Sequence, residues 1–144
     1  NMVTYAPNAT TTTTYNRAKF KPHDKTLIRV AKSTFNAAAN SIPADGQSVN
    51  AMTIPAGSVI LAVNVDVTTA EGANTPFDIG FTDGEHFLSN GNAGAATQSV
   101  CLGVPYLVQS AKKICISADG AALNNCIMDL YAVYVEFDTL SATN

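Results

Sequence analysis

The stretch Val59-Ile60-Leu61-Ala62-Val63-Asn64-Val65-Asp66-Val67-Thr68-Thr69 decides the fold class. Every second residue from Val59 to Val67 is Val or Leu, and the residues between them turn from apolar to polar. This period of two predicts a β-strand that is buried on one face throughout and on the other only at its start. After a break at 71–76, Phe77-Asp78-Ile79-Gly80-Phe81-Thr82 repeats the alternation. The two stretches predict a long antiparallel hairpin at the centre of a β-sandwich.

Further short apolar runs separated by turn residues predict a chain of seven or eight strands. The last run, residues 126–138, is apolar on both faces in its middle and is expected to be a central or interface strand. No segment combines a helical period with caps, so the sheets are predicted to be antiparallel, in an all-β sandwich of jelly-roll type. The other expected strands are 26–32, with Ile28 and Val30 on one face, 49–53, 99–104 and 113–118; 33–40 is expected to form at most a helical turn, and 89–96 a loop.

Charge divides the chain into two parts. Residues 1–32 carry six Lys or Arg and one Asp, a net charge of +5, whereas residues 33–144 carry two Lys and ten Asp or Glu, a net charge of −8. A basic leading segment on an acidic body is typical of an interaction arm. Charged residues make up only 13% of the chain, against about 25% in typical proteins, which favours a surface in contact with other proteins.

Residues 1–25 are expected to form an extended N-terminal arm and residues 26–144 the sandwich. The run Thr10–Thr14 has no alternation that could fix a register, so the arm needs a partner to hold it. Aromatic and cationic residues interleave in the arm, which predicts docking on an acidic protein; the alternative is a solvated tail. No nucleic acid is expected as a partner, because the acidic body repels phosphates. The predicted docking residues are Tyr5, Tyr15, Arg17, Lys19, Phe20 and Lys21.

Self-association is predicted through the last strand. Tyr131, Tyr134 and Phe137 lie on both of its faces, and a core of two layers can bury only one face fully. Tyr suits an interface because its ring is apolar while its hydroxyl stays hydrated. A homodimer or homotrimer is expected.

The residues give no sign of catalysis, and neither an enzyme nor a cofactor is predicted. No G-x-S-x-G motif is present, and neither of the only imidazoles, His23 and His86, belongs to a recognised nucleophile motif. The single carboxylate cluster is Asp78, Asp83 and Glu85. We expect Asp78 to face solvent on its strand and the other two to cap a turn, in preference to a Ca²⁺ site and, after that, a glycosidase pair.

The three cysteines, Cys101, Cys115 and Cys126, each sit in an apolar run without C-x-x-C spacing. They are expected to be small buried side chains rather than disulfide partners, which favours a reducing compartment during assembly. No apolar run reaches the ~18 residues that a transmembrane helix needs, and no signal peptide is recognised, so no membrane partner is expected.

Three segments resemble small structural proteins of tailed bacteriophages: Ile54-Pro55-Ala56-Gly57, the long valine strand, and the segment from Phe77-Asp78-Ile79-Gly80 to Phe87-Leu88. Those proteins tend to show such a corner, a valine-rich strand and a D-[IV]-G segment before an acidic turn. The resemblance implies a virion protein, most specifically a capsid decoration (cement) protein. Such a protein would sit on the outer surface of the head, bind and bridge the major capsid protein, and assemble in the host cytoplasm.

The alternative function is a carbohydrate- or receptor-binding module of a phage fibre or tail tip. Sugar binding calls for exposed aromatic rings, and the chain has no Trp and five Tyr, two of them in the arm.

Overall fold

The computed structural model describes residues 26–82 and 84–137, and all regular structure in these ranges is strand. This confirms the all-β prediction, and no described segment forms a helix that could cross a membrane. Residues Ile28–Glu136 form one compact unit, to which the following account refers. The strands are β1 (Thr26–Asn36), β2 (Ser48–Ile54), β3 (Ser58–Thr69), β4 (Pro76–Phe81), β5 (Leu88–Asn92), β6 (Gln98–Val100), β7 (Tyr106–Val108), β8 (Lys112–Ala118) and β9 (Ile127–Phe137).

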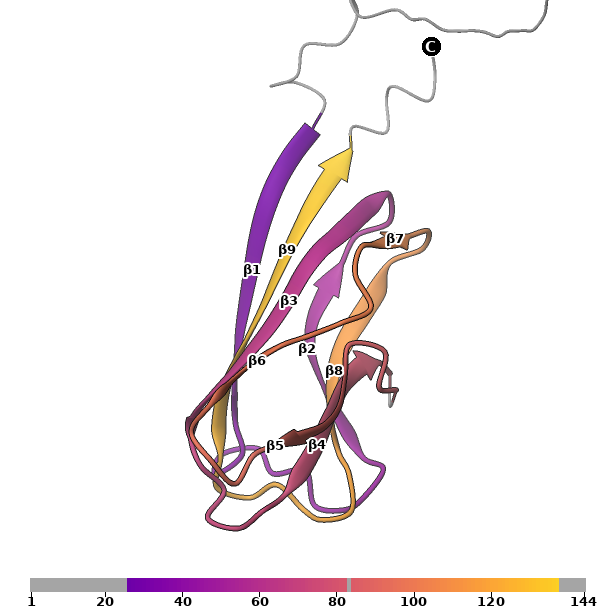
Figure 1. Cartoon of the computed structure of the whole chain (residues 1–144). Helices are drawn as coiled ribbons and strands as arrows, with labels where there is room; N and C mark the ends of the chain where they lie inside the picture. The colour runs from indigo at the N-terminus through magenta and orange to yellow at the C-terminus, as the bar shows by residue number, and fades with distance from the viewer. Residues whose placement is uncertain (1–25, 83, 138–144) are drawn as a thin grey trace, which may run out of the picture. The chain divides into compact units, whose positions relative to one another are not determined.

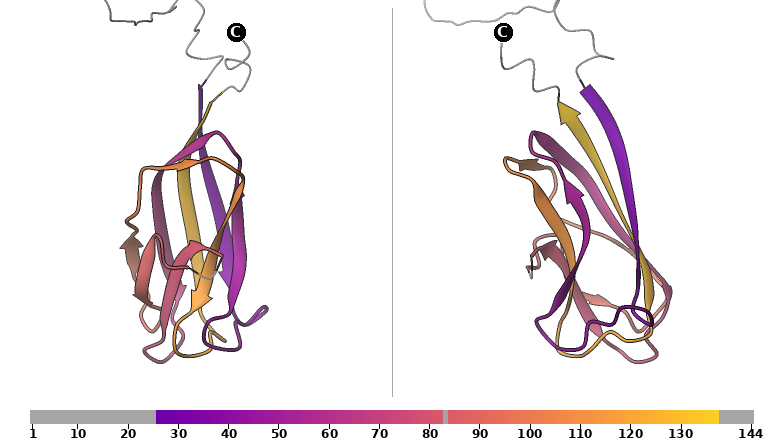
Figure 2. Two further views of the ribbon diagram at one scale, coloured as in Figure 1. Left: turned by 90° about the vertical axis from the view of Figure 1, so that its right-hand side faces the viewer. Right: turned by 180° about the vertical axis from the view of Figure 1, so that it is seen from behind.

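Two antiparallel sheets pack face to face (Figures 1 and 2). The first has the order β1-β9-β3-β6, with β7 also paired to β3, and the second has the order β2-β8-β4-β5. The pairs are nested along the chain: β1 with β9, β2 with β8, β3 with β6 and β7, and β4 with β5. The chain is therefore a long hairpin rolled around one core, which is the jelly roll that the sequence predicts.

The predicted central hairpin of residues 59–69 and 77–82 is wrong. β3 pairs with β9, β6 and β7, whereas β4 pairs with β8 and β5 in the other sheet. Each strand has an apolar side, and placing the strands in opposite sheets turns both sides toward the same core. The alternation alone could not reveal this, because it reports which side of a strand is buried and not which strand lies beside it.

A β-bulge in β3 changes which of its residues face the core. Ile60 pairs with Tyr134 and Ala62 with Val133, so Leu61 is an extra residue on its strand. Ile60 is fully buried while Leu61 is 44% exposed. The expected buried series from Val59 to Val67 is therefore correct only from residue 63 onward.

The other corrections concern strand limits. β1 continues to Asn36 where a turn was expected, and β5 occupies residues that were expected to be a loop. β5 was not predicted because Gly91 makes the segment read as a loop. A Cβ at Gly91 would lie 2.8 Å from the Cζ atom of Phe77, so the missing side chain leaves space for that ring. The strand expected at 99–104 ends at Val100, as the short β6, and β7 is a further short strand beyond the predicted range.

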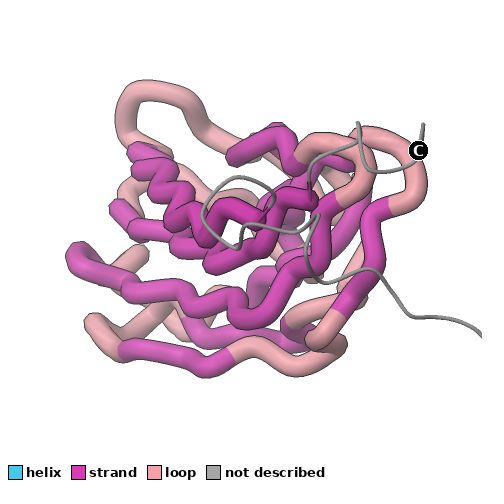
Figure 3. The backbone as a smooth tube through the Cα atoms, turned by 90° about the horizontal axis from the view of Figure 1, so that it is seen from above, coloured by secondary structure: helices cyan, strands magenta, loops and turns pink. Residues whose placement is uncertain are grey.

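The core lies between the two sheets, and β9 contributes to it as the sequence predicts. Met128, Leu130 and Ala132 are buried on one face of β9, which lies between β1 and β3 as a central strand. Figure 3 shows the strands of the two layers from above. Other large buried side chains are Phe77, Phe87, Ile42, Ile54, Ile60, Ile79, Ile114, Ile116 and Leu123.

The Ile54-Pro55-Ala56-Gly57 corner carries the chain from one sheet to the other. Ile54 ends β2 and is fully buried, and β3 begins at Ser58 in the opposite sheet. Gly57 has a φ of +81°, a backbone conformation that costs little only for glycine, and its N–H donates to the carbonyl of Val108 over 2.8 Å. The corner is therefore built for the crossing between the sheets.

Glu71 ties two loops at one end of the sandwich. Its carboxylate accepts hydrogen bonds from the backbone N–H groups of Asn124, Asn125 and Cys126, at 2.9 to 3.0 Å. The loop between β3 and β4 is thereby fixed to the start of β9. Burial raises the pKa of Glu71, but these hydrogen bonds together outweigh burial and leave the pKa below its usual value.

We expect Glu71→Ala to lower the free energy of unfolding by about 1–3 kcal/mol, because three donors to a charged acceptor lose their partner. A lowered pKa also means that the carboxylate stabilises the fold above its unfolded-state value of about 4.5, and that this stabilisation is lost as the pH falls through the folded-state value. Urea unfolding at pH 7 and at pH 3 measures both effects. Equal losses at the two pH values would contradict the role given to the charge.

Gly80 allows the turn after β4 to fold back onto the strand. A Cβ at this position would lie 2.5 Å from the carbonyl oxygen of Gly84 and 2.6 Å from the backbone nitrogen of His86. Both obstacles are backbone atoms, so the turn itself would have to move. This close approach explains the glycine of the Asp78-Ile79-Gly80 segment.

We expect Gly80→Ala to cost about 1–3 kcal/mol and to shift the amide resonances of residues 84–87. Gly46→Ala is the matched control, because Gly46 has a φ of +77° but open space around its Cβ position. That control should cost only about 1 kcal/mol of backbone strain and leave the turn resonances in place. If the two variants behaved alike, steric contact at Gly80 would not be the cause.

Candidate interaction surface

One outward sheet face is the strongest candidate for a binding surface. The first sheet turns Met128, Leu130 and Ala132 of β9 toward the core, so the alternating residues of β9 point outward. The outward residues on the half of the sheet where β3 begins are apolar, and we call them the outer apolar face. They are Ile28 and Val30 of β1, Val133 and Val135 of β9, Val59 and Leu61 of β3, and Leu107 of β7.

The strand register holds these residues together. Val59 lies directly opposite Val135 on one side and Leu107 on the other, so three neighbouring strands present apolar side chains in one row. Directly opposite residues share a face of the sheet. On β1, Thr34 and Lys32 contact the outward Asp129, which fixes the face on which Ile28 and Val30 lie.

The exposure of this face is high. Ile28 is 73% exposed, Val30 69% and Leu107 55%. Contiguous apolar side chains at this exposure are uncommon on monomeric proteins and mark interaction sites. This face is therefore the strongest candidate interaction surface among the described residues.

The other half of the same sheet face carries paired polar groups beside the exposed Val100 of β6, which lies opposite Asn64. Lys32 lies 3.7 Å from a carboxylate oxygen of Asp129, and Thr34 donates to the other oxygen over 2.6 Å. The Lys32 ammonium also lies 5.6 Å from the ring centre of Tyr131. The polar groups of Lys32, Thr34 and Asp129 are therefore paired with one another, unlike the exposed apolar side chains of the outer apolar face.

The three aromatic residues predicted as an oligomer interface do not share a face. Tyr131 points outward, whereas Tyr134 packs against the core and pairs with the buried Ile60. Phe137, the last residue of β9, is 48% exposed. The predicted arm residues Tyr5, Tyr15, Arg17, Lys19, Phe20 and Lys21 lie outside the described residues, as does His23.

Sequence reasoning missed most of the outer apolar face. Val59 and Leu61 were expected to face the core, and Leu107 lay outside any expected strand. Ile28 and Val30 gave a signal, since they alternate with Arg29 and Ala31, but alternation does not say which side meets solvent. Knowledge of the Leu61 bulge would have been needed to assign the face of β3.

The two described carboxylates of the predicted cluster accept hydrogen bonds from residues of β5. Asp78 accepts the N–H of Asn90 over 2.9 Å, and Glu85 accepts the hydroxyl of Ser89 over 3.4 Å. Burial raises the pKa of Asp78, and the charges of Asp119, Glu85 and Asp45 add to that rise, against the hydrogen bond from Asn90. Asp83 lies outside the described residues. Within the described ranges no three His, Cys, Asp or Glu side chains gather as metal ligands.

All three cysteines are described, buried and without a disulfide, as predicted. Burial raises the pKa of Cys101 to about 11 and that of Cys126 to about 12. A thiol with such a pKa is almost entirely protonated at neutral pH and is a poor nucleophile. Cys115 donates to the side-chain oxygen of Asn50 over 3.1 Å. The cysteines therefore act as structural side chains.

His86 belongs to an aromatic cluster with Phe81, Phe87 and Tyr106. Ring centres in this cluster lie 4.8 to 5.1 Å apart, and the imidazole Nε2 lies 3.0 Å from the carbonyl oxygen of Gly103. The rings pack against one another at an angle. They therefore do not present the flat exposed face on which a sugar would stack.

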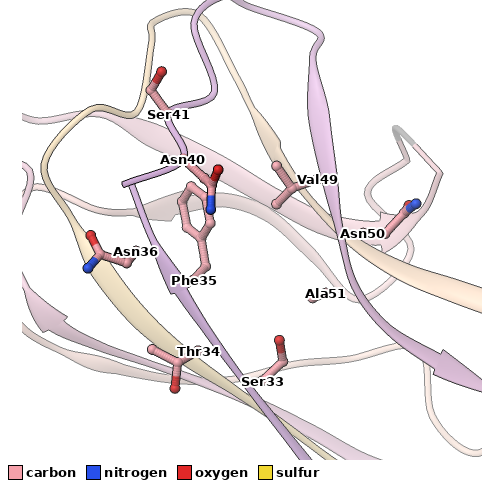
Figure 4. Close-up of a pocket in the computed structure, with 9 residues that line it drawn as sticks. All are labelled: Ser33, Thr34, Phe35, Asn36, Asn40, Ser41, Val49, Asn50 and Ala51. Atoms are coloured by element: carbon pink, nitrogen blue, oxygen red, sulfur yellow. The ribbon is translucent and has the colours of Figure 1, made fainter. Parts of the chain in front are cut away.

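A cavity of about 360 Å³ opens between the end of β1 and β2, the edge strands of the two sheets (Figure 4). No charged or titratable side chain lines it, so it offers shape and hydrogen bonds but no chemistry. Its lining residues are Ser33, Thr34, Phe35, Asn36, Asn40, Ser41, Val49, Asn50 and Ala51.

Comparison with protein-family models gave no match, and comparison with curated proteins gave none either. Solved structures of similar fold include chains from three bacteriophage capsids. A chain in the acidic stable capsid of Helicobacter pylori bacteriophage KHP30 has a TM-score of 0.59 and 19% identity, over 77% of this chain and 91% of that one.

A chain in the capsid asymmetric unit of cyanophage Pam1 has a TM-score of 0.64 and 11% identity, over 85% of this chain and 97% of that one. A chain in the capsid of Ralstonia phage GP4 has a TM-score of 0.65 and 13% identity, over 83% of this chain and 90% of that one. At these identities the likeness is one of fold. The resemblance to phage structural proteins predicted from the sequence is thus confirmed at the level of the fold, which this chain shares with chains of bacteriophage capsids.

Proposed function

We propose that this protein is a non-enzymatic structural protein of a bacteriophage virion, and more specifically a decoration (cement) protein that binds and bridges major capsid subunits on the outside of the head. The observation that carries the proposal is the jelly-roll likeness to chains of three phage capsid structures, over 77% or more of this chain. The outer apolar face supports a role in assembly, since such a face needs a protein partner.

The described residues give little support to the alternatives. A hydrolase needs an activated nucleophile or a carboxylate pair in a cleft, whereas the carboxylates of Asp78 and Glu85 accept local hydrogen bonds and the described imidazole contacts a backbone carbonyl. A carbohydrate-binding module needs exposed flat rings, whereas the rings of His86, Phe81 and Tyr106 pack against each other.

In this proposal the arm of residues 1–25 makes the contact with the major capsid protein. Its aromatic residues would serve as apolar anchors in an added strand, and Arg17, Lys19 and Lys21 would meet acidic residues of the shell. Charges at an interface mainly raise the association rate, whereas buried apolar anchors mainly set the dissociation rate.

The outer apolar face is proposed as the surface through which copies associate as a homodimer or homotrimer. The body carries −8 in residues 33–144, so two copies repel each other over most of their surface. The seven residues of the outer apolar face include no charged side chain, which makes this face the place where a second copy can approach at least cost. Tyr131 borders this face, and Val133 and Val135 of the same strand replace the predicted interface residue Tyr134, which packs against the core.

Deleting residues 1–25 should leave the melting temperature of the body nearly unchanged and remove most of the binding to empty heads. The reason is that the core lies within Ile28–Glu136 while the docking residues lie in the deleted arm. Co-sedimentation with purified heads and thermal unfolding measure the two effects. Replacing Arg17, Lys19 and Lys21 by Gln should slow binding at low salt and matter less at high salt. Full head binding by the truncated protein would place docking elsewhere.

Ile28→Glu together with Val30→Glu should convert the associated protein to a monomer, because both side chains are highly exposed and would place two charges in an apolar contact. Sedimentation equilibrium at micromolar concentration measures the mass. The control, Asn64→Asp with Asn92→Asp, adds the same charge at exposed sites outside the outer apolar face and should leave association intact. A monomeric wild-type protein, or a double Glu variant of unchanged mass, contradicts the assignment.

A further inference from the structure

We propose that Lys112 and Lys113 form a docking site for a carboxylate-rich protein segment. The inference rests on the proposed function in one respect: on a phage head the segment would belong to the shell. The site lies at the end of the second sheet, where β8 begins beside the end of β4, on a different sheet from the outer apolar face. It is thus separate from the proposed self-association surface.

The distribution of charge sets these two lysines apart. They are the only cations among residues 33–144, which also hold ten carboxylates. The other described cations have carboxylate partners, Arg29 with Glu136 at 2.9 Å and Lys32 with Asp129 at 3.7 Å. Neither Lys112 nor Lys113 forms an ion pair in the described part of the chain. Among residues 26–82 and 84–137, no carboxylate is therefore ion-paired with either body cation.

The two lysines line one pocket. It has a volume of about 250 Å³, and its other lining residues are Phe81, Thr82 and Ala111. The Lys112 ammonium lies 5.4 Å from the ring centre of Phe81. This cation–π contact restricts the position of the ammonium group beside the pocket. Lys113 is exposed on β8, opposite Thr53 of β2. Both residues line this opening, Lys112 from the side of β8 that faces the core and Lys113 from its outer side.

The chemistry of this pocket fits carboxylates carried on a chain. Each ammonium offers three donors, and the Phe81 ring and the methyl group of Ala111 give an apolar wall for the methylene groups of Asp or Glu. Lys112 and Lys113 are positively charged, as is the proposed arm. Both cationic features of the chain would then face acidic protein, while the acidic body repels anything of its own sign.

The test is an NMR titration of the full chain with a hexaglutamate peptide at low salt, with hexaglutamine as the neutral control peptide. Besides any shifts in the basic arm of residues 1–25, we expect amide shifts at residues 81–82 and 111–113 with hexaglutamate and none with hexaglutamine, and the affinity of the pocket is read from these five residues. Lys112→Gln with Lys113→Gln should weaken hexaglutamate binding about fivefold to tenfold, and 0.5 M salt should remove most of the difference, as for exposed charges. The matched control, Arg29→Gln with Lys32→Gln, removes two paired cations and should change the affinity less than about twofold.

Several outcomes overturn the inference: no shifts at these residues, equal weakening by both double variants, or binding of tripolyphosphate to this pocket as tight as that of hexaglutamate, which would indicate a general anion site. A change of oligomer mass in the Lys112→Gln and Lys113→Gln variant would show that the acidic partner is a second copy rather than the shell, and would also overturn it. Head binding is measured separately. Heads that bind the wild-type chain without any peptide response would leave the cement function standing and remove only this site.

Discussion

Everything in this structure depends on the burial of one side of each strand in a core shared by two sheets. Ile60 from β3, Ile79 from β4, Ile116 from β8 and Leu130 from β9 are all fully buried between the layers. Removing such side chains from water supplies roughly 1.5–3 kcal/mol each, and the nested pairing of strands brings them together from distant parts of the chain. The opposite sides of the strands face outward, so their side chains can form binding surfaces.

The sequence predicted the parts of the fold that follow from local alternation. The strands around residues 59–69 and 126–138 were expected within one or two residues of their observed limits, because long period-two patterns are unambiguous. The pairing of strands could not be predicted in the same way. The β3 and β4 strands lie in opposite sheets, and the Leu61 bulge moves Val59 to the outside, because both depend on what lies across from each residue.

The candidate surfaces were harder to predict than the fold. An exposed Ile28 or Leu107 looks, in a sequence, like any other strand residue, and only the burial of alternate residues on β9 shows which side is free. The cysteines were easier, because each sits in an apolar run and is buried in the structure. Lys112 and Lys113 were visible as the only body cations, but their shared pocket beside Phe81 required the fold.

The arm, the outer apolar face and the lysine pocket are proposed to act together in one assembly. The outer apolar face belongs to the first sheet and the lysine pocket to the second, so contact between copies and contact with an acidic shell would not compete. The strongest test of the account is a cryo-electron microscopy reconstruction of heads that carry the protein. The account predicts jelly-roll density on the outside of the shell, with Ile28 and Val30 covered by a neighbouring copy. Density inside the shell, or a decorated head in which this sheet face meets only solvent, would contradict it.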